Sequence, residues 1–301
     1  MHDNKGRKTR WNVYPLILCG LVFFVITATI FCMVVNSREA KKEARREQIK
    51  AEQQAAAEEQ KKKAEEVKAQ EEEARKESFK VRPGTPVGTM DPQDGEKVVY
   101  LTFDDGPSKN TQPILDILEQ YGAKATFFIT GGHEDCRPLI KKAYEAGHTI
   151  GLHTYSHDYA TVYSSVEAYF DDLEKIGEVA KEQIGYVPCF IRFPGGASNT
   201  VSAKYTSGIM TELTRLVQEK GYQYYDWNVS SGDGDVCSAD EIVQNSTTDQ
   251  YDHVMILFHD AATKDTTVEA LPRVIEYYKN LGYEFRAIDR ESFVSHHKTN
   301  N

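Results

Sequence analysis

The sequence has 301 residues, enough for one large domain or two small ones, and its overall composition is that of an ordinary globular protein. The charge is unevenly distributed: residues 1–79 carry 16 Lys and Arg against 13 Asp and Glu, whereas residues 80–301 carry 20 against 33, a balance of −13. A domain this acidic repels the phosphate backbone of nucleic acids, so we expect no nucleic-acid partner.

Residues 13–35 form an uncharged apolar stretch whose length suits a helix that crosses a bilayer. A cleaved signal peptide is the alternative, but its apolar core is shorter, about 7–15 residues, and a small-residue cleavage site follows it. No such site is clear here, so we expect a single-pass membrane anchor preceded by a cytoplasmic N-terminus over residues 1–12. Basic residues flank the stretch on both sides, so the positive-inside rule does not decide its orientation.

Residues 36–79 are predicted to form a charged helical stalk. They are mostly Ala, Glu, Lys, Arg and Gln, contain neither Gly nor Pro, and place many opposite charges four positions apart. The apolar positions are mainly alanine, and Ile49 and Val67 are too few for a tight coiled coil. Residues 80–95 contain six Pro and Gly residues and are predicted to form a linker.

From Lys97 onward, short β-branched and aromatic runs alternate with amphipathic helical stretches that each end in Gly. The strand candidates are residues 98–103, 125–130, 148–153, 188–193, 222–229, 253–259 and 284–288. About seven repeats of strand and helix predict parallel strands with helical crossovers. We therefore predict an α/β fold, a distorted (β/α) barrel with about seven parallel strands over residues 96–295. An open doubly wound sheet is the alternative.

Three cysteines, Cys136, Cys189 and Cys237, lie in the acidic part of the chain without any CxxC spacing. A cysteine zinc site is therefore not indicated. The sequence is compatible with one disulfide plus a free thiol, or with three reduced cysteines.

Reactive side chains are concentrated at the ends of the predicted strands, where barrels of this kind carry their active sites. Taken singly, each has an ordinary explanation: Asp-Asp-Gly-Pro is a good turn, and an arginine at a strand end often forms a salt bridge. Their occurrence at the same end of successive strands predicts a catalytic site. The candidates are Asp104, Asp105, His153, His157, Arg192, Trp227, Asp233, Leu257 and His259.

Five segments in this order resemble the motifs of the polysaccharide deacetylases, the NodB-homology or carbohydrate esterase 4 family. They are TFDDGPS (102–108), HTYSH (153–157), RFPGG (192–196), DWNVSSGD (226–233) and ILFHD (256–260). The resemblance covers about residues 95–290. Two positions depart from the commoner pattern: Gly195 stands where an aromatic residue is frequent, and Ser230 where an Asp is frequent. These departures concern the substrate groove more than the reaction.

The resemblance implies that Asp105, His153 and His157 bind one divalent metal ion, Zn²⁺ in the first place and Co²⁺ or another ion as alternatives. Two imidazoles and a carboxylate suit such an ion and leave coordination positions open for water. Asp104 matches the general base, and Arg192 matches the residue that orients it. The backbone N–H of Gly195 matches a donor to the oxyanion that forms on attack.

The remaining matches concern the leaving group and the acetyl group. His259 matches the general acid that protonates the departing amine, and Asp233 the carboxylate that orients it and favours the imidazolium. Trp227 and Leu257 match the walls of a small apolar pocket for the acetyl methyl. Ordinary strand core is the alternative for these two residues.

The expected function is therefore metal-dependent N-deacetylation of N-acetylglucosamine in a cell-surface polymer, with peptidoglycan as first choice. An anchor through residues 13–35 and a helical stalk would hold an extracellular catalytic domain near the wall, at the cell membrane. The alternatives are another N-acetylated or acetylated polysaccharide (poly-N-acetylglucosamine, chitin oligomers, acetyl-xylan) and a catalytically inactive sugar-binding homologue. The intact set of reactive side chains argues against the last.

Overall fold

The computed structural model describes residues 14–92 and 95–301. The expected cytoplasmic segment 1–12, the first residue of the apolar stretch and two residues of the expected linker lie outside this description. The chain divides into two compact units, Met1–Glu72 and Glu73–Asn301.

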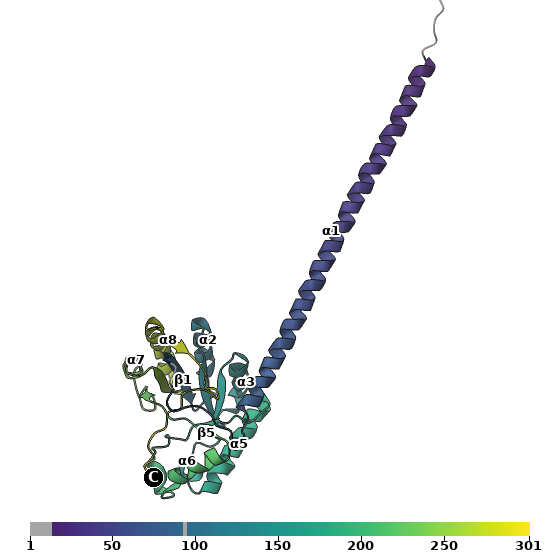
Figure 1. Ribbon diagram of the computed structural model, residues 1–301. Helices are drawn as coiled ribbons and strands as arrows, with labels where there is room; N and C mark the ends of the chain where they lie inside the picture. The colour runs from purple at the N-terminus through teal and green to yellow at the C-terminus, as the bar shows by residue number, and fades with distance from the viewer. Residues whose placement is uncertain (1–13, 93–94) are drawn as a thin grey trace, which may run out of the picture. The chain divides into compact units, whose positions relative to one another are not determined.

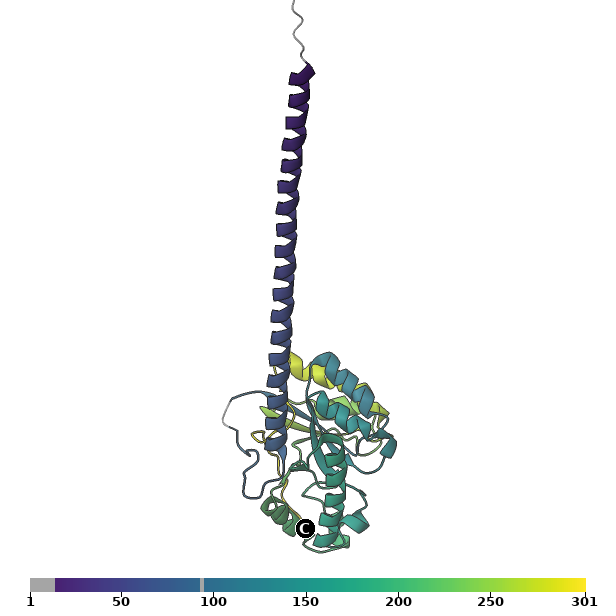
Figure 2. The same ribbon diagram turned by 90° about the vertical axis from the view of Figure 1, so that its right-hand side faces the viewer.

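The first unit consists of most of helix α1 (Tyr14–Phe79), in which the apolar stretch and the charged stalk are one continuous helix (Figures 1 and 2). Within the described residues it is the one helix long and apolar enough to cross a membrane, with a mean hydropathy of 2.3 over an 18-residue window. Its large apolar side chains are exposed, and those of Phe23 and Met33 are each 71% exposed. The polar part carries i,i+4 ion pairs such as Lys63 with Glu59, at 2.6 Å.

The second unit is built on a sheet in which every strand pair is parallel. The strands are β1 (Val98–Asp104), β2 (Ala125–Thr130), β3 (Thr149–Thr154), β4 (Phe190–Ile191), β5 (Gln223–Tyr224), β6 (Val229–Ser230), β7 (His253–His259) and β8 (Glu284–Phe285). Their order is β5-β4-β3-β2-β1-β7-β6, and β8 also pairs with β1. Chain neighbours are thus sheet neighbours from β1 to β5 and for β6 with β7, and β1 pairs with β7, as in a barrel opened between β5 and β6. This confirms the predicted distorted barrel.

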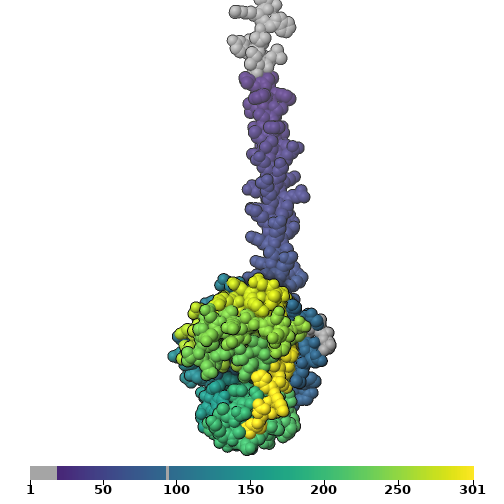
Figure 3. Space-filling model, turned by 90° about the vertical axis from the view of Figure 1, so that its left-hand side faces the viewer, coloured from purple at the N-terminus to yellow at the C-terminus, as the bar shows by residue number. Residues whose placement is uncertain are grey.

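The prediction of one strand over residues 222–229 was wrong, because this segment forms β5 and β6 at opposite edges of the sheet. The backbone between them bonds elsewhere: the carbonyls of Tyr225 and Asp226 accept from Arg192, and the Asp226 N–H donates to the Ser295 carbonyl at 2.8 Å. Residues 225–228 therefore cross the open side of the barrel. The C-terminal segment lies against them and runs as a yellow strip along the surface (Figure 3).

Helices surround the strands (Figure 1) and connect them. They are α2 (Thr111–Tyr121), α3 (Pro138–Glu145), α4 (Tyr159–Val162), α5 (Val166–Ile184), α6 (Ile209–Glu219), α7 (Ala239–Ser246) and α8 (Asp265–Asn280), with short 3₁₀ helices η1 (Glu134–Cys136) and η2 (Val201–Lys204). Gly122 and Gly185 end α2 and α5 with φ of 66° and 86°, the left-handed conformation predicted for them. Every cysteine in the described range is a free thiol, which agrees with the alternative of three reduced cysteines and not with that of one disulfide.

The last turns of α1 belong to the second unit, although the sequence placed them in the stalk. Phe79 is 7% exposed and packs edge-to-face on Phe190, with ring centroids 5.0 Å apart. Arg75 donates to the carbonyl of His148 at 2.6 Å and lies over the ring of Tyr144, 4.6 Å from its centroid. The core of the unit is thus covered at this point by residues that precede the expected linker.

We predict that Phe79→Ala lowers the free energy of unfolding by about 3–5 kcal/mol, because it removes a buried ring and leaves a cavity beside Phe190. The measurement is urea unfolding of a fragment of residues 38–301. Val67→Ala is the matched control: it truncates an exposed side chain of the same helix and should change the value by no more than about 0.5 kcal/mol. Equal unfolding midpoints for the two variants would show that Phe79 does not belong to the core.

Candidate active site

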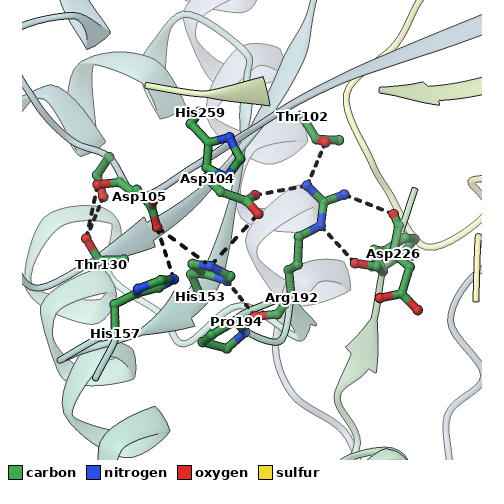
Figure 4. A network of polar contacts seen from close by, with 12 residues as sticks. Thr102, Asp104, Asp105, Thr130, His153, His157, Arg192, Pro194, Asp226 and His259 are labelled. Carbon is green, nitrogen blue, oxygen red and sulfur yellow. Dashed lines mark hydrogen bonds and ion pairs between the residues drawn. The ribbon is translucent and has the colours of Figure 1, made fainter. Parts of the chain in front are cut away.

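The carboxyl ends of β1, β3, β4 and β7 bring the predicted residues together in one cluster (Figure 4). Asp104 is the last residue of β1 and lies opposite His259, the last residue of β7, in the sheet register. Asp105 and His157 have φ of 71° and 50°, and they are the non-glycine residues with positive φ in the described chain. Such conformations cost energy and are found mainly where function requires them.

The three predicted metal ligands lie together, with one ligand atom from each within 4.8 Å of the others. The Oδ1 atom of Asp105 is 3.4 Å from Nε2 of His157 and 3.7 Å from Nε2 of His153. This Oδ1 is buried and accepts no hydrogen bond from any described residue. A buried anionic oxygen without a partner is costly, and a cation between it and the two imidazole nitrogens would remove that cost.

His153 is arranged as a neutral ligand. Its Nδ1 lies 2.7 Å from the carbonyl oxygen of Arg192, which can only accept, so Nδ1 carries the proton and Nε2 presents a lone pair to Asp105. Burial, assisted by the neighbouring His157, lowers the pKa of His153 to about 3. The donor set of two imidazole nitrogens and one carboxylate oxygen therefore fits a divalent metal ion.

Arg192 is fully buried and holds the candidate base. Its Nη1 lies 2.9 Å from Oδ1 of Asp104 and donates to the hydroxyl of Thr102 at 2.7 Å. The other oxygen of Asp104, Oδ2, lies 3.9 Å from Nε2 of His153 and so faces the ligand cluster. Burial raises the pKa of Asp104 above its ordinary value, although the charge of Arg192 opposes the rise. A carboxylate of raised basicity beside a metal site is suited to accept a proton.

His259 and Asp233 form a second pair on the other side of Asp104. Nδ1 of His259 lies 2.7 Å from Oδ1 of Asp233, and the backbone N–H of His259 donates to Oδ2 at 2.8 Å. Thr267 on α8 also donates to Oδ2, at 2.7 Å. Burial works against the imidazolium, but the hydrogen bond and charge of Asp233 outweigh it and raise the pKa of His259 to about 9. At neutral pH His259 is therefore a proton donor whose Nε2 remains available.

The three residues assigned to the substrate lie in segments that adjoin this cluster. Gly195 has φ of 75°, and its turn is held by the hydroxyl of Tyr163, which donates to the Pro194 carbonyl at 2.8 Å. The Trp227 ring lies so close to Gly196 that a Cβ there would come within 3.0 Å of it. Leu257 is 8% exposed and lies two positions before His259 on β7, so both side chains face the same side of the sheet.

Some contributing residues were not predicted to act in the site. Asp226 accepts the backbone N–H groups of Ala197 at 2.8 Å and of His297 at 2.7 Å, and it thereby fixes the turn beside Gly195. Asp260 is fully buried against Gly106 and accepts from Thr111 at 2.6 Å. Asp226 and Asp260 lie within the motifs named above, so the motifs could have pointed to them. Thr267 lies outside every motif, and nothing in the sequence pointed to it.

The site thus combines a ligand set that fits a cation, a buried carboxylate and an imidazolium. A carboxylate and an imidazolium placed in this way can deprotonate a water molecule and protonate a leaving group in one reaction.

We predict that Asp233→Asn lowers the pKa of His259 from about 9, because burial is then opposed only by the weaker effects of Asp104 and Asp105. An NMR titration of the imidazole measures it. The control is Asp235→Asn, which neutralises an exposed carboxylate two residues away and should leave this pKa near 9. An unchanged pKa in Asp233→Asn would show that Asp233 does not maintain the charge of His259.

Comparisons with known proteins identify relatives of this chain. Residues 91–210 match the family model of polysaccharide deacetylases. A peptidoglycan-N-acetylglucosamine deacetylase of Bacillus cereus is 33% identical over 204 residues, which are 65% of this chain and 71% of that protein. A peptidoglycan-N-acetylglucosamine deacetylase of Listeria monocytogenes is 32% identical, over 64% of this chain and 38% of that protein.

Two solved structures extend the similarity to the fold. The catalytic domain of a peptidoglycan N-acetylglucosamine deacetylase from Eubacterium rectale has 42% identity and a TM-score of 0.68, covering 72% of this chain and 99% of that one. A polysaccharide deacetylase from Bacillus cereus has 33% identity and a TM-score of 0.58, covering 68% and 97%. The chain therefore belongs to the polysaccharide deacetylase family, whose NodB-type domain it carries.

Proposed function

We propose that this protein is a metal-dependent hydrolase that removes the acetyl group from N-acetylglucosamine residues of peptidoglycan. The observation that carries the proposal is the convergence of Asp104, the three-residue ligand set and His259 at one edge of the sheet. The names of the relatives from Bacillus cereus, Listeria monocytogenes and Eubacterium rectale support the choice of substrate.

The ligands of the ion are Asp105, His153 and His157, and Zn²⁺ is the proposed ion, with Co²⁺ or another divalent ion as alternatives. When bound, such an ion polarises the acetyl carbonyl and lowers the pKa of a coordinated water toward about 7. The protein's part is to fix the ligands, and the hydrogen bond from His153 to the Arg192 carbonyl does so for one of them.

Asp104 takes the proton of the attacking water through Oδ2, the oxygen that faces the ligand cluster. Its Oδ1 remains bound to Arg192, so the carboxylate keeps one orientation throughout. Attack on the carbonyl carbon produces an oxyanion, to which the backbone N–H of Gly195 donates. A donor held in place before the reaction stabilises this charge without reorganisation.

The reaction ends when the C–N bond breaks and the amine accepts a proton from Nε2 of His259. Asp233 holds the ring through Nδ1 and keeps the imidazolium populated at neutral pH. Trp227 and Leu257 line the apolar pocket for the acetyl methyl, which allows an acetyl group and excludes bulkier acyl groups. Each group then has one role in the addition of water to the carbonyl or in the loss of the amine.

The proposed setting is the outer face of the cell membrane. The apolar part of α1 supports a single-pass anchor over residues 13–35, followed by a charged stalk over 36–79 and a linker over 80–95. The catalytic domain, assigned to residues 96–295, would then be extracellular and within reach of the wall polymer. An anchor and a stalk would hold the catalytic domain close to a substrate in the wall.

We predict that the purified, metal-loaded protein converts muropeptides to species that lack one acetyl group per glucosamine, and that a chelator abolishes the conversion until Zn²⁺ or Co²⁺ is added. Mass spectrometry of the muropeptides measures the mass change. Acetylated xylan and chitin oligomers are the comparison substrates. Activity on xylan alone would contradict the proposed substrate, and full activity after exhaustive metal removal would contradict the metal.

We predict that Asp104→Asn keeps the metal but lowers turnover by about 10²–10⁴-fold, the usual contribution of a general base. The amide is near-isosteric with the carboxylate, yet it cannot take the proton. Metal analysis and initial rates of acetate release are the two measurements. Asp249→Asn, which alters an exposed carboxylate that precedes β7, is the control and should turn over like the wild type. Comparable rates for both variants would show that Asp104 is not the base.

A further inference from the structure

The turn of Gly195 and Gly196 is enclosed by two aromatic side chains from different parts of the chain. A Cβ added to Gly195 would lie 2.5 Å from the hydroxyl oxygen of Tyr159, and one added to Gly196 would lie 3.0 Å from the Trp227 ring. The Tyr159 hydroxyl therefore occupies the space that a side chain at position 195 would enter. This is the position at which the sequence departs from the commoner aromatic residue.

The structure fixes the ring of Tyr159 from both sides. Tyr159 is the first residue of α4, and Asp158 caps this short helix by accepting the N–H groups of Ala160 and Thr161. The ring packs edge-to-face on His157, with centroids 5.9 Å apart, and on Tyr163, at 5.4 Å. One neighbour is thus a proposed metal ligand and the other holds the turn of Gly195 through Pro194.

The hydroxyl of Tyr159 does not help to hold the described part of the structure together. It makes no hydrogen bond within the part of the chain that the structure describes, and the side chain is half-buried. By contrast, the hydroxyl of Tyr163 is bonded to the Pro194 carbonyl. A phenol that is held rigidly by its ring and keeps its donor free beside a reaction site is suited to bind a substrate oxygen.

We propose that Tyr159 is a substrate-contacting residue whose hydroxyl donates a hydrogen bond to an oxygen of the N-acetylated sugar next to the Gly195 N–H. Gly195 has no side chain that could contact the substrate. Tyr159, two residues after His157, would make this contact in its place. The inference rests on the proposed function, because it places an acetylated amino sugar over this turn. The acceptor is either the acetamide carbonyl oxygen or a neighbouring ring hydroxyl.

The test compares wild type with Tyr159→Phe, which keeps the ring and its contacts and removes only the hydroxyl. We expect kcat/KM for muropeptide deacetylation to fall about two- to tenfold, the contribution of one hydrogen bond. Metal content and melting temperature should not change. Tyr251→Phe is the matched control, because it removes an exposed phenol that precedes β7 at the opposite end of the strand from His259, and it should behave as wild type.

The kinetic constants identify the oxygen. An unchanged kcat with a raised KM indicates a ring hydroxyl, which is bound equally in the ground state and the transition state. Equal losses in kcat and kcat/KM indicate the carbonyl oxygen, which gains charge during the reaction. Wild-type kinetics in Tyr159→Phe would overturn the inference.

Binding separates this inference from the proposed function. Calorimetry with muropeptides and the metal-loaded Asp104→Asn protein, with and without Tyr159→Phe, measures the contact without turnover. Weaker binding in the double variant supports a contact that is already made in the ground state. Equal affinity together with an unchanged kcat in Tyr159→Phe overturns the inference. A wild-type protein that binds muropeptides but releases no acetate would refute the proposed function, while the affinities would still decide the role of Tyr159.

Discussion

The buried guanidinium of Arg192 is the interaction on which the arrangement of the site depends. A cation without solvent contact is tolerated only when its N–H groups are paired, and removing a partner from such a group costs about 3–5 kcal/mol. Arg192 donates to the side chains of Asp104 and Thr102 on β1 and to the carbonyls of Tyr225 and Asp226 in the segment that crosses the open side of the barrel. Its guanidinium also lies 4.4 Å from the ring centroid of Phe128 on β2. One side chain thus connects three strands of the fold with the crossing segment.

The same residue also links the proposed base to the proposed metal ligands. The side chain of Arg192 orients Asp104, and its carbonyl oxygen sets the tautomer of His153. A displacement of Arg192 would therefore alter the position of the base and the direction of a ligand lone pair together. The proposed acid, His259, is positioned separately, through Asp233 and Thr267, so the two proposed proton-transfer groups are held by independent sets of hydrogen bonds.

Much of the fold and of the site was predictable from the sequence, because strand-helix alternation and reactive residues at strand ends are local patterns. The division of residues 222–229 was not, since an aromatic-rich run looks the same whether it forms one strand or two. The segment is divided because Arg192, which precedes Tyr225 by 33 residues, donates hydrogen bonds to the carbonyls of Tyr225 and Asp226. The packing of Phe79 on Phe190 and the position of Tyr159 over Gly195 are likewise contacts between segments distant in the chain. Composition and periodicity carry no signal for such contacts.

The C-terminal segment has a consequence for how the protein is made. Asp226, which fixes the turn beside Gly195, accepts the backbone N–H of His297. The His297 ring is hydrogen-bonded through Nε2 to the Trp227 carbonyl at 2.7 Å and packs edge-to-face on the Trp227 ring, with centroids 4.7 Å apart. Contacts of such large sequence separation form slowly, because the chain loses the entropy of closing a long loop before the contacts stabilise it. During synthesis, a growing chain can form the sheet from β1 to β5 long before His297 exists, but the wall that contains Trp227 lacks its support until then. Nascent chains would therefore carry the proposed metal ligands and the proposed base before His297 is present to support Trp227, so the proposed acetyl pocket would be completed after these groups are in place.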